Sequence, residues 1–189
     1  MRHITKLLRN RLPFFNRQAT PEIPEEPKNR PAEPSDFALG RSRGGFGTKL
    51  HLVTDRAGTP LGAVVTAGQD HESVSFETLM DTVRVRGKDG RRRPDAVAGD
   101  KGYSYPRIRA WCRRRGIEVV IPTRSDQPRE RLDRGKYRGR NAVERCIGWL
   151  KGCRRLATRY EKLATHFLAV VTLAMIQRCL RLLDPSNRT

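Results

Sequence analysis

Thr48-Lys49-Leu50-His51-Leu52-Val53-Thr54 precedes the turn Asp55-Arg56-Ala57-Gly58-Thr59-Pro60, and the mainly apolar run 61–67 follows that turn. Polar and apolar side chains alternate along residues 48–54, which is typical of a β-strand. Glycine and proline between two such runs favour a tight connection, so residues 48–67 are predicted to form a β-hairpin. The fold class follows from this hairpin and from the segments that come after it.

Helical and strand patterns alternate after the hairpin. The expected segments are a helix beginning near Ser73 or Ser75, a strand at 95–99, a helix at 104–115, a strand at 117–121, a helix from about 139 to beyond 149, and a final helix at 161–183. Residues 122–136 are expected to be a basic loop, and residues 152–158 a break between the last two helices. This order predicts an α/β domain with a mixed sheet and flanking helices.

A large excess of positive charge indicates a polyanionic partner. The chain has 189 residues, enough for one domain with a core, and 39 Lys and Arg against 20 Asp and Glu give a formal net charge of +19. This charge favours nucleic-acid binding, while a merely basic protein such as a ribosomal one remains an alternative from charge alone.

The cysteines show no zinc-site spacing. Cys112, Cys146, Cys153 and Cys179 form no CxxC pair, and no histidine has ligand spacing with them. We expect reduced and mostly buried thiols in a cytosolic protein. The apolar run 167–176 is too short to span a bilayer and is expected to be part of a core helix.

The N-terminal segment differs in composition from the rest. Residues 1–19 are basic with scattered apolar positions, which favours a short amphipathic helix interrupted at Pro13 or a transit peptide. Residues 21–34 are rich in Pro and Glu and are expected to be a disordered linker. The predicted division is therefore a disordered segment at 1–39 and a folded domain at 40–185.

Four residues in the C-terminal half share one helical face. Tyr137, Arg140, Glu144 and Lys151 line up when residues 137–151 are placed on a helix. A carboxylate flanked by fixed cations suits a site that holds a metal ion and grips phosphate. The alternative is that Arg140 and Glu144 form an ordinary solvent-exposed i,i+4 pair.

The complete pattern resembles the signature of DDE transposases of the IS4/IS5 type, in which Tyr, Arg, Glu and Lys follow one another at these intervals. Gly40-Arg41-Ser42-Arg43-Gly44-Gly45-Phe46-Gly47 and Ala98-Gly99-Asp100-Lys101-Gly102-Tyr103 are also similar to motifs of IS5-family insertion-sequence transposases. The similarity covers residues 35–183, and its motifs occur in the expected order. It implies an RNase H-like fold, which the order of helices and strands also fits.

The resemblance implies roles for particular residues. Asp100 and Glu144 would be the second and third members of the catalytic D-D-E triad and ligands of Mg²⁺ or Mn²⁺ in a two-metal site. Arg140 and Lys151 would bind the DNA backbone or the cleaved strand, and Tyr137 would contact DNA near the scissile phosphate. Further candidate contacts to phosphate are Lys101, Arg41, Arg43 and Lys49. On its own, Asp100 also fits an ordinary turn or helix-capping residue, and His71 is expected to be a hydrogen-bonding loop residue.

The chain departs from the family pattern before residue 40. The first triad aspartate should lie on a strand upstream of the glycine motif, but residues 1–39 contain only Asp36, in a Pro-rich loop. Asp55 lies in the hairpin turn. We therefore expect the first carboxylate and its strand to be absent, as in a truncated or frameshifted copy or one that needs an upstream reading-frame product, and little or no cleavage by this chain alone.

The leading interpretation is a DNA transposase that cleaves and joins an insertion sequence by metal-dependent phosphoryl transfer. The alternatives are a non-catalytic DNA-binding remnant and a structure-specific nuclease on the same fold. The expected partners are double-stranded DNA, both transposon ends and target, and a second copy of the chain, with no membrane. The expected location is the bacterial cytoplasm, at the nucleoid.

Overall fold

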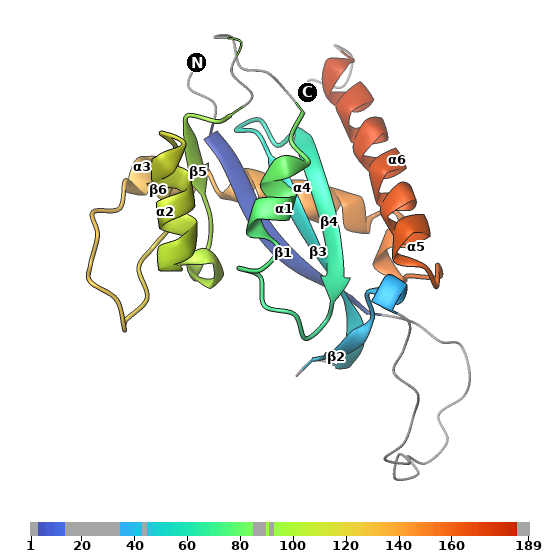
Figure 1. Cartoon of the computed structure of the whole chain (residues 1–189). Coiled ribbons are helices and arrows are strands. Elements are labelled where there is room, and N and C mark those ends of the chain that lie inside the picture. Colours follow the sequence, from blue (N-terminus) through green and yellow to red (C-terminus); the bar gives the residue numbers. More distant parts are fainter. Residues whose placement is uncertain (1–3, 14–34, 43–44, 85–89, 91–92, 185–189) are drawn as a thin grey trace, which may run out of the picture.

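A six-stranded mixed sheet runs through the described part of the chain (Figure 1). The computed structural model describes residues 4–13, 35–42, 45–84, 90 and 93–184. The strands are β1 Ile4–Pro13, β2 Gly40–Ser42, β3 Gly45–Thr54, β4 Pro60–Ala67, β5 Ala96–Ala98 and β6 Glu118–Val120. The predicted hairpin is confirmed as β3 and β4, and the two predicted buried strands are confirmed as β5 and β6.

The centre of the sheet is β1. It pairs antiparallel with β3 through residues 6–13 and parallel with β5 through residues 4–6. β4 and β2 both pair antiparallel with the other side of β3, and β6 pairs parallel with β5. A first strand that lies centrally, antiparallel to the long strand β3 and parallel to β5, the strand after the first helix, gives an RNase H-like fold, as predicted.

The expectation that the N-terminal strand is missing, and that residues 1–19 favour a helix, is wrong for residues 4–13. These residues form β1, a ten-residue strand. The physical reason is that β3 and β5 would otherwise both present unpaired backbone groups at the middle of the sheet. β1 satisfies both edges, although its sequence, ITKLLRNRLP, contains no Asp or Glu. The prediction of a disordered linker at 21–34 lies outside the described residues.

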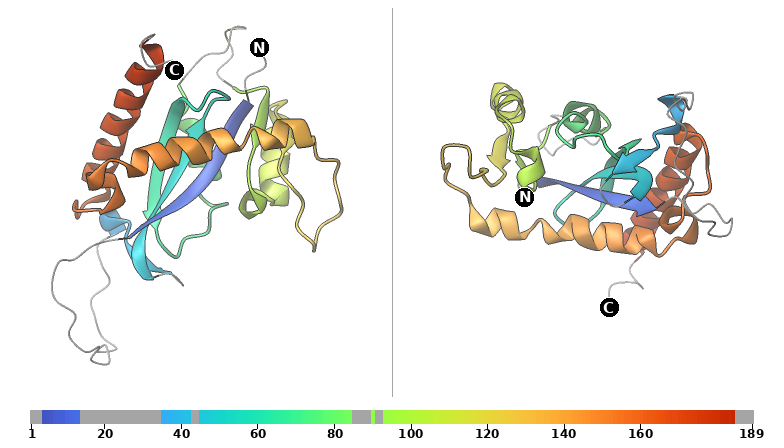
Figure 2. Two further views of the ribbon diagram at one scale, coloured as in Figure 1. Left: turned by 180° about the vertical axis from the view of Figure 1, so that it is seen from behind. Right: turned by 90° about the horizontal axis from the view of Figure 1, so that it is seen from below.

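Helices cover both faces of the sheet. They are α1 Phe76–Asp81, α2 Pro106–Arg114, α3 Arg134–Arg138, α4 Asn141–Lys151, α5 Arg154–Ala157 and α6 Ala164–Leu183, with 3₁₀ turns η1 Ser35–Phe37 and η2 Lys101–Tyr103. Figure 2 shows α1 and α2 on one side of the sheet and α4 crossing the other. α3 lies partly in the predicted basic loop, and α5 in the predicted break.

Side chains of the sheet alternate between two cores. Val53 and Val97 pack with Phe76, Ile108 and other residues on the side of α1 and α2. Leu50 and Leu52 pack with α4 and α6 on the opposite side, and their partners include Val143, Ile147, Leu150, Phe167 and Val171. The alternation means that each strand residue can be assigned to a face of the sheet.

α6 lies beside β4 at one edge of the molecule (Figures 1 and 2). Phe167, Val171 and Ala174 are buried, so the prediction of a core helix holds for one of its faces. The apolar run at 167–176 is only part of this helix, and by length and composition alone α6 as a whole could cross a membrane. Only 17% of its most apolar window is buried.

A buried arginine joins distant parts of the chain. Arg159 is fully buried and donates hydrogen bonds to the backbone oxygens of Phe37 at 2.6 Å, Glu161 at 2.9 Å and Lys162 at 2.8 Å. It also donates to Thr48 Oγ1, and its guanidinium lies 5.0 Å from the ring centroid of Phe167. Burial lowers the pKa of this guanidinium, and the nearby Glu161 opposes that effect. Arg159 therefore ties η1 and β3 to the start of α6.

Candidate active site

Asp100 stands two residues beyond the end of β5. Its backbone is extended, and its Oδ1 accepts a hydrogen bond of 2.9 Å from the backbone N–H of Gly102, which caps η2. The sequence left open whether Asp100 is a site residue at the end of a strand or an ordinary capping residue. The structure shows that Asp100 caps a turn and also follows a strand of a parallel pair. The end of such a strand is where sites form in α/β sheets.

The alternation of β5 indicates which face carries Asp100. Ala96 and Ala98 pack with Tyr137, just before α4, whereas Val97 faces the core under α1 and α2. Asp100 continues the series of Ala96 and Ala98 in extended backbone. By this alternation, the backbone position of Asp100 corresponds to the face of the sheet that is covered by α4, the helix that carries Glu144.

Three residues of the C-terminal motif are linked to one another. Arg140 Nη2 lies 2.6 Å from Glu144 Oε1, with the two side chains 27% and 41% exposed. The Arg140 guanidinium lies 5.5 Å from the ring centroid of Tyr137. The i,i+4 pair considered from the sequence is present, and it holds the arginine between the tyrosine and the carboxylate.

The four motif residues were predicted to lie on one continuous helix, but the structure divides them between two helices. Tyr137 belongs to α3, which ends at Arg138, and Glu144 and Lys151 belong to α4, which begins at Asn141. Gly139 and Arg140 keep helical dihedral angles, so the break changes the predicted face only slightly. Lys151 is the exposed last residue of α4, two turns beyond Glu144.

The remaining predicted DNA contacts divide into exposed and buried residues. Lys101 in η2 and Arg41 in β2 are exposed, and Arg43 lies outside the described residues. The prediction that Lys49 contacts phosphate is wrong, because Lys49 is 4% exposed. Its Nζ lies 3.4 Å from Glu72 Oε1 and donates to the backbone oxygen of Asp70.

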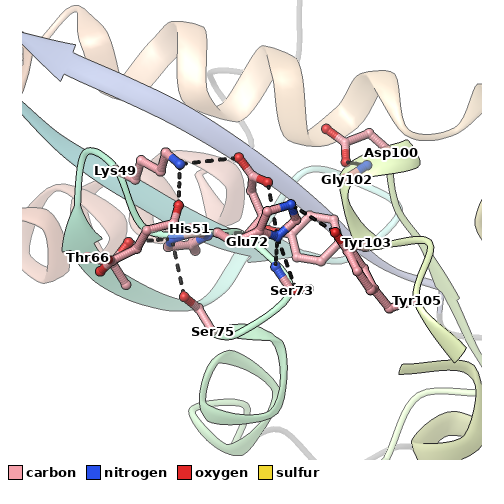
Figure 3. A network of polar contacts seen from close by, with 12 residues as sticks. Lys49, His51, Thr66, Glu72, Ser73, Ser75, Asp100, Gly102, Tyr103 and Tyr105 are labelled. Carbon is pink, nitrogen blue, oxygen red and sulfur yellow. Dashed lines mark hydrogen bonds and ion pairs between the residues drawn. The ribbon is translucent and has the colours of Figure 1, made fainter. Parts of the chain in front are cut away.

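Lys49 belongs to a buried polar network that sequence reasoning missed (Figure 3). His51 contacts the hydroxyl of Tyr103 at 3.3 Å and that of Thr66 at 2.9 Å. The signal was the alternation in β3, which places Lys49 and His51 on the same face as the buried Val53. A strand buried on both faces must provide partners for such polar side chains.

This network reaches the turn that carries Asp100. Tyr103 and Tyr105 come three and five residues after Asp100, and Tyr105 Oη lies 3.0 Å from Nε2 of His71. His71 also contacts Ser73, so its predicted role as a hydrogen-bonding loop residue is confirmed. A Cβ placed on Gly102 would lie 2.9 Å from Asp100 Oδ1 and 3.4 Å from Glu72 Oε2. A glycine therefore lets the turn pass close to both carboxylates.

The donor set fits a hard divalent cation only in part. Asp100 and Glu144 offer carboxylate oxygens, the ligands that Mg²⁺ and Mn²⁺ prefer. Within the described residues no three His, Cys, Asp or Glu side chains are grouped to hold a metal ion. Nor does the central strand β1 supply a carboxylate. The arrangement has two residues of the right type on one face of the sheet.

The four cysteines are free thiols. Cys112 and Cys146 are buried, and Cys153 and Cys179 are half-buried. Burial raises the pKa of Cys112 to about 12 and that of Cys146 to about 11. These two thiols are therefore protonated core residues and not nucleophiles.

Comparison with known proteins identifies relatives of this sequence. Residues 27–177 match the family described as the transposase DDE domain. The transposase assigned to insertion sequence element IS402 of Burkholderia cepacia is 40% identical over 121 residues, which cover 62% of this chain and 56% of the relative. The one assigned to IS6501 of Brucella ovis is 31% identical over 138 residues, which cover 71% of this chain and 98% of the relative. The chain thus spans about half the length of the IS402 relative.

Solved structures show a more distant likeness. The Mos1 transposase paired-end complex with the left transposon end is 15% identical, with a TM-score of 0.37, over 77% of this chain and 54% of that one. The piggyBac transposase synaptic complex with hairpin DNA is 12% identical, with a TM-score of 0.39, over 66% of this chain and 23% of that one.

Proposed function

The chain belongs to the transposase DDE-domain family, and from this premise we propose that its function is the cleavage and strand transfer of an insertion sequence of the IS5 type. The proposal is supported by the position of Asp100, two residues beyond the end of β5, and by the packing of Ala96 and Ala98 of that strand with Tyr137, which precedes the helix α4 that carries Glu144. Two carboxylates on one face of an RNase H-like sheet suit metal-dependent phosphoryl transfer. We place the protein at the bacterial nucleoid, in the cytoplasm.

In this proposal each residue has a distinct role. Asp100 and Glu144 would hold Mg²⁺ or Mn²⁺, and a pair of such ions would supply activation of the attacking oxygen and stabilisation of the leaving oxygen. Arg140 orients the Glu144 carboxylate through their 2.6 Å contact. Tyr137 and Lys151 flank that pair and contact the DNA near the reacting phosphate, and Lys101 and Arg41 bind the backbone further away. The substrates are the transposon ends and the target duplex.

A second candidate function is DNA binding without catalysis. The observation that favours it is the absence of Asp and Glu from β1, the strand between β3 and β5. A two-metal site usually needs a carboxylate that bridges the ions, and Asp100 with Glu144 supplies only two ligands. A structure-specific nuclease on this fold would lack the same bridging carboxylate.

Metal binding tests the proposed site. We expect weak Mn²⁺ binding that is lost in both Asp100→Asn and Glu144→Gln, because each change keeps the shape of the side chain but removes the charge that binds the cation. The measurement is the free-ion electron paramagnetic resonance signal of Mn²⁺ titrated with protein. Asp126→Asn is the control, since Asp126 is an exposed carboxylate paired with Arg124. Equal Mn²⁺ binding by all four proteins would contradict the assignment of Asp100 and Glu144 as ligands.

DNA affinity should depend steeply on salt and weakly on sequence, because the basic surface would act mainly on phosphates. Each lysine–phosphate contact that is lost should reduce the slope of log K against log salt by about one. We therefore expect Lys151→Ala to reduce the slope measured by fluorescence anisotropy with duplex DNA. Lys136→Ala is a matched control, because Lys136 already pairs with Glu118 and Asp133. A flat slope for the unmodified protein, or strong preference for one sequence, would count against this mode of binding.

A further inference from the structure

The outward face of α6 carries a row of large apolar side chains. Leu173, Ile176, Leu180 and Leu183 are 66%, 51%, 61% and 72% exposed. The opposite face of the same helix is anchored in the core through Phe167, Val171 and Ala174. α6 therefore has one face that belongs to the fold and a second apolar face that the described part of the chain leaves open.

The spacing of this row is that of a coiled-coil seam. Leu173, Ile176, Leu180 and Leu183 are separated by three, four and three residues, as at alternating a and d positions of a heptad. The same spacing extends toward the N-terminus through Ala169 and His166, which are also exposed. We call these six residues the α6 seam. A seam of this kind fits the equivalent seam of another helix, because the knobs of each fill the holes of the other.

The charge around the seam favours a second copy of the chain over other partners. Residues 163–177 contain no Asp, Glu, Lys or Arg, although the formal net charge of the chain is +19. Thr172 and Gln177 flank the middle of the seam, so two copies can approach there without the repulsion between cations expected elsewhere on the surface. A DNA duplex would find no cation on this stretch to contact its phosphates.

The same features argue against a lipid occupant. The anchored face of α6 packs against β4, α4 and α5, so lipid cannot surround the helix while the domain stays folded. The guanidinium groups of Arg178 and Arg181 lie 5.4 and 5.8 Å from the ring centroid of Trp149, which keeps two cations beside the C-terminal half of the helix.

We propose that the α6 seam is a self-association surface on which the α6 helix of a second copy of this chain docks. The seam spans about 26 Å at 1.5 Å per residue. A single helix pair of this length buries less than the roughly 800 Å² per partner of a standard interface, so the dimer is weak and forms in the micromolar range. The dimer forms whether or not the chain cleaves DNA.

Sedimentation equilibrium of the purified full chain from about 1 to 200 μM, without DNA, tests this inference over the range where micromolar complexes form. The weight-average mass should rise from that of one chain toward that of two. Leu173→Glu combined with Leu180→Glu should remove this rise. Arg154→Glu is the control, because it changes the net charge by the same two units at an exposed residue of α5, outside the seam. It should associate at least as well as the unmodified chain.

A monomer at every concentration of the unmodified protein would overturn the proposal, whatever the variants do. So would equal association by the unmodified chain and the double variant, with both shown by circular dichroism to be folded. Co-sedimentation of a monomeric chain with phosphatidylcholine vesicles, lost in the double variant, would replace the second copy with a lipid surface and would also overturn it.

Discussion

Arg159→Ala should lower the free energy of unfolding by about 4 kcal/mol, which is at the upper end of single-substitution effects. The substitution removes the donor for the half-buried carbonyl oxygens of Phe37, Glu161 and Lys162, and for the hydroxyl of the buried Thr48. Each buried acceptor left unsatisfied costs about 1–3 kcal/mol. Removal of the guanidinium also ends its contact with the ring of Phe167 and leaves a cavity, which adds to the loss of the hydrogen bonds.

Urea denaturation followed by circular dichroism measures this effect. Arg155→Ala is the matched control, because Arg155 is a neighbouring arginine that pairs with Glu161 but is 70% exposed. The Glu161 side chain is only 9% exposed, so loss of this pair should cost about 1–2 kcal/mol, well below the effect of Arg159→Ala. Arg159→Lys should be intermediate, since it keeps the charge but loses the planar arrangement of donors. Similar stabilities for Arg159→Ala and Arg155→Ala would show that Arg159 does not hold η1 and β3 to α6.

The sequence predicts well those features whose causes are local. The β3–β4 hairpin depends on alternation and on turn residues such as Gly58 within twenty positions, and both strands were predicted. The contacts among Tyr137, Arg140 and Glu144 follow from helical spacing, and the structure brings these three side chains together. The short interruption between α3 and α4 was not predicted, because Gly139 and Arg140 keep helical dihedral angles and no sequence signal marks the break.

Features that depend on distant pairing were missed. β1 is a strand because β3 and β5 lie on either side of it, and those partners follow about 40 and 90 positions later. Lys49 was predicted to contact the DNA backbone or to lie on a solvated strand face, but Glu72 provides a buried partner 23 positions away. The role of Arg159 depends on Phe37, 122 positions earlier. A local sequence pattern cannot predict interaction partners that lie tens of positions away in the chain.

The register of β1 indicates where a third carboxylate would lie in the proposed site. The parallel pairs Ile4–Ala96, Thr5–Val97 and Lys6–Ala98, continued by two residues, put position 8 beside Asp100. Across the antiparallel ladder position 8 pairs with Leu52, which faces α4. Position 8 is therefore between Asp100 and Leu52 on the face of the sheet where Glu144 is carried, and the residue there is Leu8.

We expect the unmodified chain to show no Mg²⁺- or Mn²⁺-dependent strand cleavage, and Leu8→Asp to gain it. The added carboxylate would join Asp100 and Glu144 as a third ligand for the metal pair, and partners of a metal site each contribute at least about 10-fold to activity. Nicking of supercoiled plasmid and of DNA carrying the ends of the element measures the gain. Adding Glu144→Gln to the Leu8→Asp chain should abolish it.

Leu7→Asp is the control that distinguishes the effect of where the carboxylate is placed from the effect of adding a carboxylate to β1. It adds the same carboxylate one residue earlier, and a shift of one residue along a strand moves a side chain to the opposite face of the sheet. It should therefore cost similar stability, compared by thermal unfolding, and give no cleavage. If both variants fold and neither cleaves, Asp100 and Glu144 do not share a metal site, and DNA binding without catalysis describes the chain. If the unmodified chain itself cleaves and Glu144→Gln abolishes that activity, a third carboxylate exists elsewhere, and Asp36 and Asp55 are the residues to substitute next.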